Sequence, residues 1–275
     1  MIPTRALSDD HTLPAIGLGT YGLRGEEGVA AVCSAIVAGY RLIDTAVSYE
    51  NEAEVGRALA RSGADRQDLA ITTKVRGRDH DRARESVEES LERLGLERLD
   101  LVLVHWPLPS RDRYVAAWEG LIEAREAGLV RSIGVSNFLP EHLERIIAET
   151  GVTPVVNQVE QHPRFVQTAQ QAVHDRLGII TEAWSPLGNR RPAYDEPAIA
   201  DAATAHGVAP AQVVLRWQLQ LGAIPLPKSA TPSRQTANLD VFDFALSDGE
   251  VAAISALHRD DGRLFGGDPA TFEEL

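Results

Sequence analysis

Residues 69–105 of the chain read LAITTKVRGRDHDRARESVEESLERLGLERLDLVLVH, and this stretch decides the fold. It opens with an apolar run at 69–74, continues through a helix-like pattern at 81–95 and closes with a second apolar run at 99–105. Nearly continuous apolar runs are typical of strands covered on both faces, and a helix between two such strands is the repeating unit of a parallel sheet. The stretch therefore predicts one strand–helix–strand unit.

The same unit recurs along the whole chain. Further apolar runs lie at 16–20, 41–45, 130–137, 155–161, 178–184 and 223–228, and further helix-like patterns lie at 28–39, 51–62, 114–128 and 139–149. Eight strands alternating with helices predict an α/β fold, a (β/α)8 barrel, whose usual size is close to the 275 residues of this chain. Because no linker or shift in composition interrupts the pattern, we expect one domain over residues 1–275. We also expect a β-hairpin before the barrel and an extra helix and tail after it.

Polar side chains close seven of the eight predicted strands, about one strand–helix unit apart. In a closed barrel the carboxyl ends of all the strands meet on one face, where enzymes of this architecture place their active sites. Any one of these residues alone would be read as structural, but the whole set predicts a functional site. Its members are Asp44, Lys74, His105, Ser136 with Asn137, Gln158, Trp184 with Ser185, and Lys228.

The charge of the chain limits its partners. Its 27 basic residues face 40 acidic ones, for a net charge of −13. Such a chain repels nucleic acid and anionic membranes, so an anionic ligand would need a local basic pocket. Only two of the basic residues are lysines, Lys74 and Lys228. Where arginine is otherwise preferred, a lysine points to a position that needs a compact ammonium group.

Other compositional features point to an ordinary cytoplasmic protein. We find no signal peptide, no apolar stretch long enough to cross a membrane, and no His, Cys or Asp cluster with metal-ligand spacing, so we expect no metal site. The single cysteine, Cys33, lies in an apolar helix pattern and is read as a packing residue.

A glycine motif near the start of the chain suggests a different fold. Gly17, Gly19 and Gly22 spell the G-x-G-x-x-G of a dinucleotide-binding Rossmann fold, and Asp44 follows at a suitable distance. In that motif the third glycine lies where the helix opens, whereas here the helix pattern begins only at about Glu26. The pattern of eight units also leaves no second domain for a substrate, so we reject this interpretation.

Asp44, Tyr49, Lys74 and His105 form a chemically coherent group. An ammonium beside a tyrosine makes the phenol more acidic, and a carboxylate beside that ammonium keeps it charged. A histidine can hydrogen-bond and orient the same substrate oxygen. This group could donate a proton to a carbonyl oxygen as negative charge develops there, but a cofactor would have to supply a hydride.

The chain resembles the aldo-keto reductases along almost its full length, and most closely their bacterial diketogluconate reductase-like members. The segments that carry the resemblance are LPAIGLGTYGL, RLIDTAVSYENEAEVGRAL, TTKV, LVHWPLP, IGVSNF, NQVEQHP, AWSPLG and PKSATPSRQTANLD. The resemblance implies reduction of small aldehydes and ketones, dicarbonyls included, with NADPH as hydride donor. We also expect the protein to be a monomer.

The resemblance assigns a role to each matching position. It implies a catalytic tetrad of Tyr49 as proton donor with Asp44, Lys74 and His105. It implies substrate contacts from Tyr21, Trp106 and His105, and a tail, residues 261–275, that folds over the substrate. The cofactor contacts that it implies are Ser136, Asn137, Gln158, Trp184, Ser185, Leu187, Leu226, Lys228, Ser229, Ala230, Arg234 and Asn238.

One local pattern supports the cofactor assignment independently. Thr231 followed by Pro232 predicts the start of a helix, so backbone donors, Lys228 and Arg234 would meet at a helix N-terminus, which favours phosphate.

Four positions depart from the commoner family pattern. These are Ala237 near the predicted adenine site, Trp184 in place of a tyrosine, Tyr21 in place of a tryptophan and Glu50 in place of a glycine.

Two functions of other classes remain open. A Schiff-base lyase would also place a lysine at a barrel strand end, with Lys74 as nucleophile. A barrel that senses NADPH without useful turnover would keep the cofactor residues. The lyase would not need the predicted carboxamide and phosphate contacts, and an intact tetrad argues against the sensor.

Overall fold

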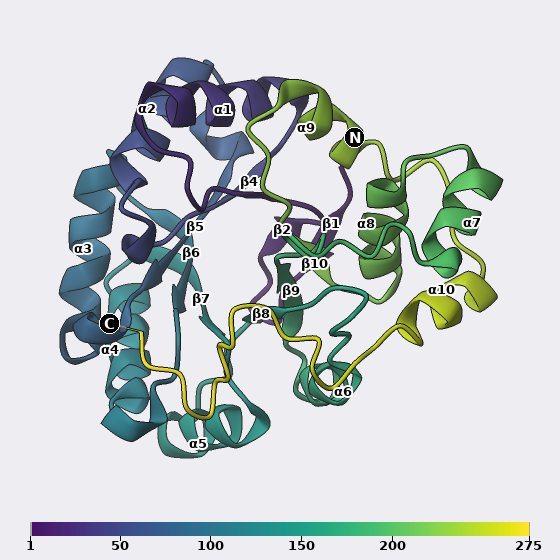
Figure 1. Cartoon of the computed structure of the whole chain (residues 1–275). Coiled ribbons are helices and arrows are strands. Elements are labelled where there is room, and N and C mark those ends of the chain that lie inside the picture. The colour runs from purple at the N-terminus through teal and green to yellow at the C-terminus, as the bar shows by residue number, and fades with distance from the viewer. Residues whose placement is uncertain (1, 275) are drawn as a thin grey trace.

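The computed structural model describes residues 2–274 and contains a barrel of eight parallel strands (Figure 1). The strand order is sequential from β10 back to β3, and each strand overlaps one of the eight predicted stretches, with β5 extending one residue beyond its stretch. Backbone hydrogen bonds from Gly17 N–H to the Pro225 carbonyl (3.1 Å) and from Gly19 N–H to the Pro227 carbonyl (3.2 Å) close the sheet into a barrel. The strands are β3 (Leu18–Gly19), β4 (Leu42–Asp44), β5 (Ala70–Val75), β6 (Leu99–Val104), β7 (Val130–Ser136), β8 (Val156–Glu160), β9 (Ile180–Trp184) and β10 (Ile224–Pro225).

Close packing at the barrel seam explains two glycines of the misleading motif. A Cβ atom at position 17 would lie 2.7 Å from the side chains of Leu42 and Leu226, and one at position 19 would lie 3.0 Å from the Leu226 carbonyl oxygen. The next helix, α1, begins only at Gly25. These glycines therefore allow strands to approach each other, and the Rossmann interpretation is rightly rejected.

Helices cover the outside of the barrel, and the two ends of the chain add to it (Figure 1). The predicted hairpin is present as β1 (Thr4–Ala6) and β2 (Thr12–Pro14), and Leu13 of β2 and Leu7, which follows β1, pack against core residues of the barrel strands. The helices are α1 (Gly25–Ala38), α2 (Glu52–Ser62), α3 (Ala83–Leu94), α4 (Tyr114–Glu126), α5 (Pro140–Thr150), α6 (Thr168–Leu177), α7 (Pro197–His206), α8 (Pro210–Gln220), α9 (Pro232–Leu239) and α10 (Asp248–Ser255), with 3₁₀ turns η1 (Val47–Tyr49), η2 (Arg66–Asp68), η3 (Gly77–Arg82) and η4 (Pro109–Arg111).

Two helices are additional to the regular alternation of strands and helices. Because β9 and β10 are joined by both α7 and α8, the long gap between Trp184 and Lys228 holds one extra helix. The other is α10, the predicted extra helix after the barrel; α7, α8 and α10 share a separate apolar cluster that includes Ile199, Trp217 and Ile254.

The tail leaves α10 and crosses the carboxyl ends of the strands toward α3 and α4 (Figure 1). The predicted tail ends at Leu275, which lies outside the described residues. No helix in the described part of the chain has the length and apolar character needed to span a bilayer.

Candidate active site

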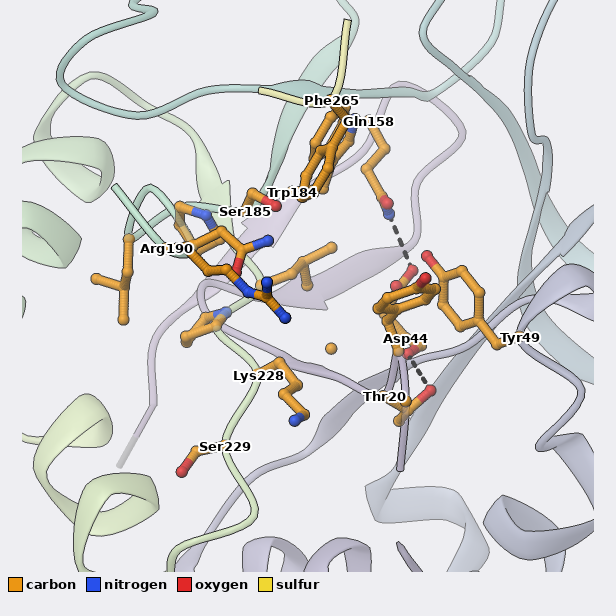
Figure 2. Close-up of a pocket in the computed structure, with 18 of the residues that line it drawn as sticks. Thr20, Asp44, Tyr49, Gln158, Trp184, Ser185, Arg190, Lys228, Ser229 and Phe265 are labelled. Carbon is orange, nitrogen blue, oxygen red and sulfur yellow. Dashed lines mark hydrogen bonds between the residues drawn. The ribbon is translucent and has the colours of Figure 1, made fainter. Parts of the chain in front are cut away.

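A cavity of about 1320 Å³ opens at the carboxyl ends of the strands, where the polar strand ends converge (Figure 2). All the predicted site residues line it except Lys74, which is buried behind its wall, and Ala230, which is exposed near its rim. Figure 2 shows Thr20, Asp44 and Tyr49 on one side of the cavity and Arg190, Lys228 and Ser229 on the other.

Lys74 and Asp44 form a buried ion pair behind Tyr49. The Lys74 Nζ lies 2.7 Å from each carboxylate oxygen of Asp44, 2.9 Å from the Thr45 carbonyl oxygen and 3.5 Å from the Tyr49 hydroxyl. Burial lowers the pKa of Lys74, but Asp44, Tyr49 and Glu182 more than offset this, and the net shift is upward. Lys74 is therefore a charged ammonium group.

The pKa of Tyr49 differs from the expectation of a more acidic phenol. Burial is the largest influence and raises its pKa, while the Lys74 ammonium lowers it by less. The upward shift means that the phenol keeps its proton at neutral pH. Tyr49 can therefore serve as a proton donor. Its pKa stays above that of a free phenol, because burial raises it by more than the Lys74 ammonium lowers it.

The 3₁₀ turn η1 carries Tyr49, and the next residue, Glu50, is the one that stands in place of the family's glycine. Glu50 ends the turn with φ 53° and ψ 38°, in the left-handed region that favours glycine. Its carboxylate accepts a hydrogen bond from Arg24 at 3.1 Å, and Arg24 also bonds to the Tyr49 carbonyl oxygen. This local network holds a conformation that glycine would adopt without strain.

Glu182 is a buried acidic residue of the site that the sequence analysis did not identify. It lies on β9 two residues before Trp184 and is 1% exposed. Because strand side chains alternate in direction, Glu182 and Trp184 point to the same side of the sheet. This alternation is the sequence signal that could have identified Glu182 as a site residue. The Gln158 amide nitrogen donates to Glu182 Oε2 (2.8 Å) and to Asp44 Oδ1 (2.9 Å). Gln158 therefore donates both amide N–H groups to protein oxygens, and its amide oxygen is free to accept from a ligand.

We expect Glu182→Gln to stabilise the protein more at pH 8 than at pH 5. Burial, and then the charge of Asp44, raise the pKa of Glu182 to about 8. In the unfolded chain the carboxyl loses its proton near its ordinary pKa of 4.5. Between these two values the folded state holds one more proton, so stability falls as pH rises, by up to about 4 kcal/mol.

Glutamine cannot ionise and removes this loss, so urea unfolding at both pH values should show a variant advantage that grows with pH. The exposed Glu92→Gln should show no such trend. An equal effect of Glu182→Gln at both pH values would contradict a neutral Glu182.

A second network fixes the side chains at the ends of β7 and β9. Asn137 Nδ2 donates to the His105 carbonyl oxygen and to Ser136 Oγ, both at 3.0 Å, and its Oδ1 accepts the Trp184 indole N–H at 2.8 Å. Asn137 and Ser185 have φ angles of 61° and 49°, in the left-handed region. Backbone held in this region needs support from its surroundings and is common at binding sites.

Three cations line the opposite end of the cavity. Arg190, Lys228 and Arg234 are all exposed there, and the ion pairs formed within residues 2–274 include none of them. Arg234 lies on α9, whose N-cap is Thr231 and whose first residue is Pro232, as predicted. The Thr231 side chain makes no capping bond, but Ser229 Oγ accepts the Thr231 N–H at 3.1 Å. This end suits a phosphate-bearing ligand.

Aromatic side chains and the tail bound the remaining side. The ring centroid of Tyr49 lies 5.2 Å from that of Tyr21 and 5.9 Å from that of His105, and Trp106 packs against Phe272 of the tail at 4.3 Å. The tail thus lines the cavity, as expected, together with Tyr21 and Trp106. Among residues 2–274, no group of three or more His, Cys, Asp and Glu side chains is arranged to hold a metal ion.

Comparison with known proteins gives a family match over most of the chain. The family model described as "Aldo/keto reductase family" matches residues 15–259. The chain is 56% identical to 2,5-diketo-D-gluconic acid reductase B of Corynebacterium sp., over 100% of this chain and 99% of that protein. It is 46% identical to methylglyoxal reductase DkgA of Escherichia coli K12, over 97% of this chain and 96% of that protein.

Solved structures give the same result. The structure of the D53A mutant of Gox0644 in complex with NADPH matches with a TM-score of 0.94 and 43% identity, over 99% of both chains. The structure of Bombyx mori aldo-keto reductase AKR2E4 in complex with NADP matches with a TM-score of 0.88 and 36% identity, over 94% of this chain and 93% of that one.

Proposed function

This chain belongs to the aldo/keto reductase family, and we propose that it reduces small aldehydes and ketones with NADPH, with Tyr49 protonating the carbonyl oxygen. The observation that carries the proposal is the buried Lys74–Asp44 pair, which lies directly behind the Tyr49 hydroxyl at the cavity wall. No other tyrosine that lines the cavity, among the described residues, has an ammonium group in this position.

The tetrad residues have distinct tasks in this proposal. Tyr49 donates its proton to the carbonyl oxygen as negative charge develops there. Lys74 stabilises the phenolate that remains, and Asp44 keeps Lys74 charged and fixed in place. His105 hydrogen-bonds the same oxygen and orients the carbonyl group.

The residues of the cavity fit NADPH, which supplies the hydride when bound. The Gln158 amide oxygen can accept from a carboxamide, beside Ser136 and Asn137, and Trp184 offers a flat face for a ring. Ser185, Leu187 and Leu226 line the middle of the cavity. Lys228, Ser229 and Arg234 would hold the 2′-phosphate, near Asn238, and Arg190 adds a positive charge in a chain of net charge −13.

Two observations support small dicarbonyl substrates. The relatives named above include a diketogluconate reductase and a methylglyoxal reductase, both of which take compounds with neighbouring or multiple carbonyl groups. The segments after β6 and β9 that border the cavity are short, which favours an open pocket and broad specificity.

The geometry of Lys74 disfavours the lyase alternative. A Schiff base needs a neutral amine that meets the substrate. The Lys74 side chain is fully buried, carries a raised pKa and is bonded to three oxygen atoms of Asp44 and Thr45. These properties suit a fixed charge better than a nucleophile.

The test is a titration followed by a turnover assay. NADPH should quench Trp184 fluorescence at lower concentrations than NADH, and the Trp184→Phe variant should lose this signal. NADPH oxidation should then accompany reduction of methylglyoxal and 2,5-diketogluconate. Saturable NADPH binding without turnover of any carbonyl would favour the sensor, and absence of binding would return the lyase to consideration.

That residues 1–275 act as one domain, and as a monomer in the cytoplasm, stays a prediction.

A further inference from the structure

We propose that Gln235 is a positioning residue for the 2′-phosphate of the cofactor and thereby sets the preference for NADPH over NADH. The inference rests on the proposed reductase function and adds to it a buried residue outside the cavity lining. Gln235 follows Arg234 on α9, and its side chain is bonded to Ser229, the residue after Lys228. One amide group therefore joins the two segments that carry the cations of the phosphate end.

The Gln235 amide is fully buried and bonded on both sides. Its Nε2 donates to the carbonyl oxygens of Ala31 and Ser229, both at 2.9 Å, and its Oε1 accepts from Ser34 Oγ at 2.6 Å. The residue is 0% exposed. Ala31 and Ser34 belong to α1, which packs against α9 (Figure 1). The amide thus ties the backbone at Ser229 to a helix of the barrel wall.

The chemistry of these partners fixes the orientation of the amide. A carbonyl oxygen can only accept, so Ala31 and Ser229 require the amide N–H groups on their side. A hydroxyl can donate, so Ser34 suits the amide oxygen. The reversed amide would place its oxygen against two carbonyl oxygens in a buried position, which costs free energy. Gln235 therefore acts as a donor toward Ser229.

The bond to Ser229 acts where the phosphate group would lie. It holds the peptide group between Ser229 and Ala230, directly after Lys228 (Figure 2). Lys228 and Ser229 line the cavity, and Lys228 is exposed there. Because a carbonyl oxygen and the following N–H group share one peptide plane, a fixed Ser229 carbonyl also fixes the direction of the Ala230 N–H. Gln235 therefore orders the backbone from which Lys228 and Ser229 reach the cavity.

The same side chain fixes the first turn of α9. Gln235 faces α1, whereas its neighbour Arg234 lines the cavity. Lys228 and Arg234 are thus held at set positions relative to each other. Preordered groups lose less conformational entropy when a ligand binds, so they bind a phosphate more tightly than mobile ones. NADH has no 2′-phosphate, and its affinity should not depend on this order.

The test compares the dissociation constants of NADPH and NADH in Gln235→Met, with Trp184 fluorescence as the readout. Methionine fills the site but cannot donate. Ser34 Oγ lies 3.0 Å from the Ala31 carbonyl oxygen and can still donate to it, so the lost bond falls on Ser229. We expect the Kd of NADPH to rise about fivefold, the usual cost of one neutral hydrogen bond, and the Kd of NADH to stay unchanged.

Gln220→Met is the matched control. Gln220 lies on α8 outside the cavity lining, and its amide bonds to the Leu246 carbonyl oxygen at 2.9 Å and the Leu246 N–H at 2.8 Å. Its replacement removes a comparable link and should change neither Kd, while urea unfolding confirms that both variants are folded. Equal losses of NADPH and NADH affinity in Gln235→Met, or an unchanged Kd for NADPH, would overturn the proposal.

Ser34→Ala is a milder second variant on a different helix. It removes the donor to the amide oxygen and leaves both N–H bonds of Gln235 in place. The Kd of NADPH should rise about twofold in the original chain and not at all in Gln235→Met, because the two residues act through one amide. Additive effects of the two substitutions would refute this coupling and the proposal with it.

The original chain separates this inference from the proposed function. If it bound NADPH no more tightly than NADH, the predicted phosphate site would be wrong, and the role of Gln235 with it. If it preferred NADPH and Gln235→Met kept the full preference, the phosphate site would stand and the role of Gln235 alone would be refuted.

Discussion

Replacing Tyr49 by phenylalanine should lower kcat for carbonyl reduction by a factor of about 10² to 10⁴, the usual contribution of a general acid, and leave NADPH affinity nearly unchanged. The variant loses one oxygen atom. The fold should tolerate this loss, because Lys74 keeps its contacts with Asp44 at 2.7 Å and with Thr45 at 2.9 Å. Steady-state kinetics and the NADPH titration measure the two effects separately.

Tyr114→Phe is the matched control for this substitution. Tyr114 lies on α4 away from the cavity, and its hydroxyl accepts a bond from Arg145 at 3.3 Å. Its removal should leave kcat unchanged. A Tyr49→Phe variant with full activity would rule out the proposed mechanism, whatever the control shows.

The barrel and most of the site could be predicted because they depend on local patterns. Apolar runs with single polar residues at their ends gave the strands, and barrel closure then brought Asp44, Lys74 and His105 together although they lie about 30 residues apart in sequence. Asp44 and Lys74 form the expected pair. Their contact follows from the topology, since Asp44 ends β4 and Lys74 is the penultimate residue of the adjacent strand β5.

Glu182 and Glu274 could not be assigned in the same way, for two different reasons. Glu182 lies inside a predicted strand, where only its burial and its bond to Gln158 show that it is an interior acid. Glu274, which lines the cavity, lies near the end of a tail without periodic pattern, and it accepts a hydrogen bond from the Gly77 N–H, 197 positions away. Such a contact depends on the path of an irregular segment, which no repeat in the sequence specifies. The sequence likewise could not show that burial raises the pKa of Tyr49 by more than the Lys74 ammonium lowers it.

Replacing Lys74 by methionine should both destabilise the protein and abolish most turnover. The substitution leaves the Asp44 carboxylate, whose side chain is 4% exposed, without its cation. Breaking a buried ion pair from one side costs about 3–5 kcal/mol, because an uncompensated charge remains in the interior. Urea unfolding should show this loss. Arg84→Met, which removes an exposed pair with Glu88 within α3, should cost at most about 0.5 kcal/mol.

The double variant Asp44→Leu with Lys74→Met separates stability from catalysis. Replacing both partners by apolar groups removes the buried charge as well as the attraction, so most of the lost stability should return. Part of it should not, because Gln158 also loses Asp44 as an acceptor, a bond of about 1 kcal/mol. Turnover should stay as low as in Lys74→Met, since neither variant has a cation behind Tyr49. Recovery of kcat along with stability would mean that the pair serves the fold alone and that Tyr49 needs no ammonium to act.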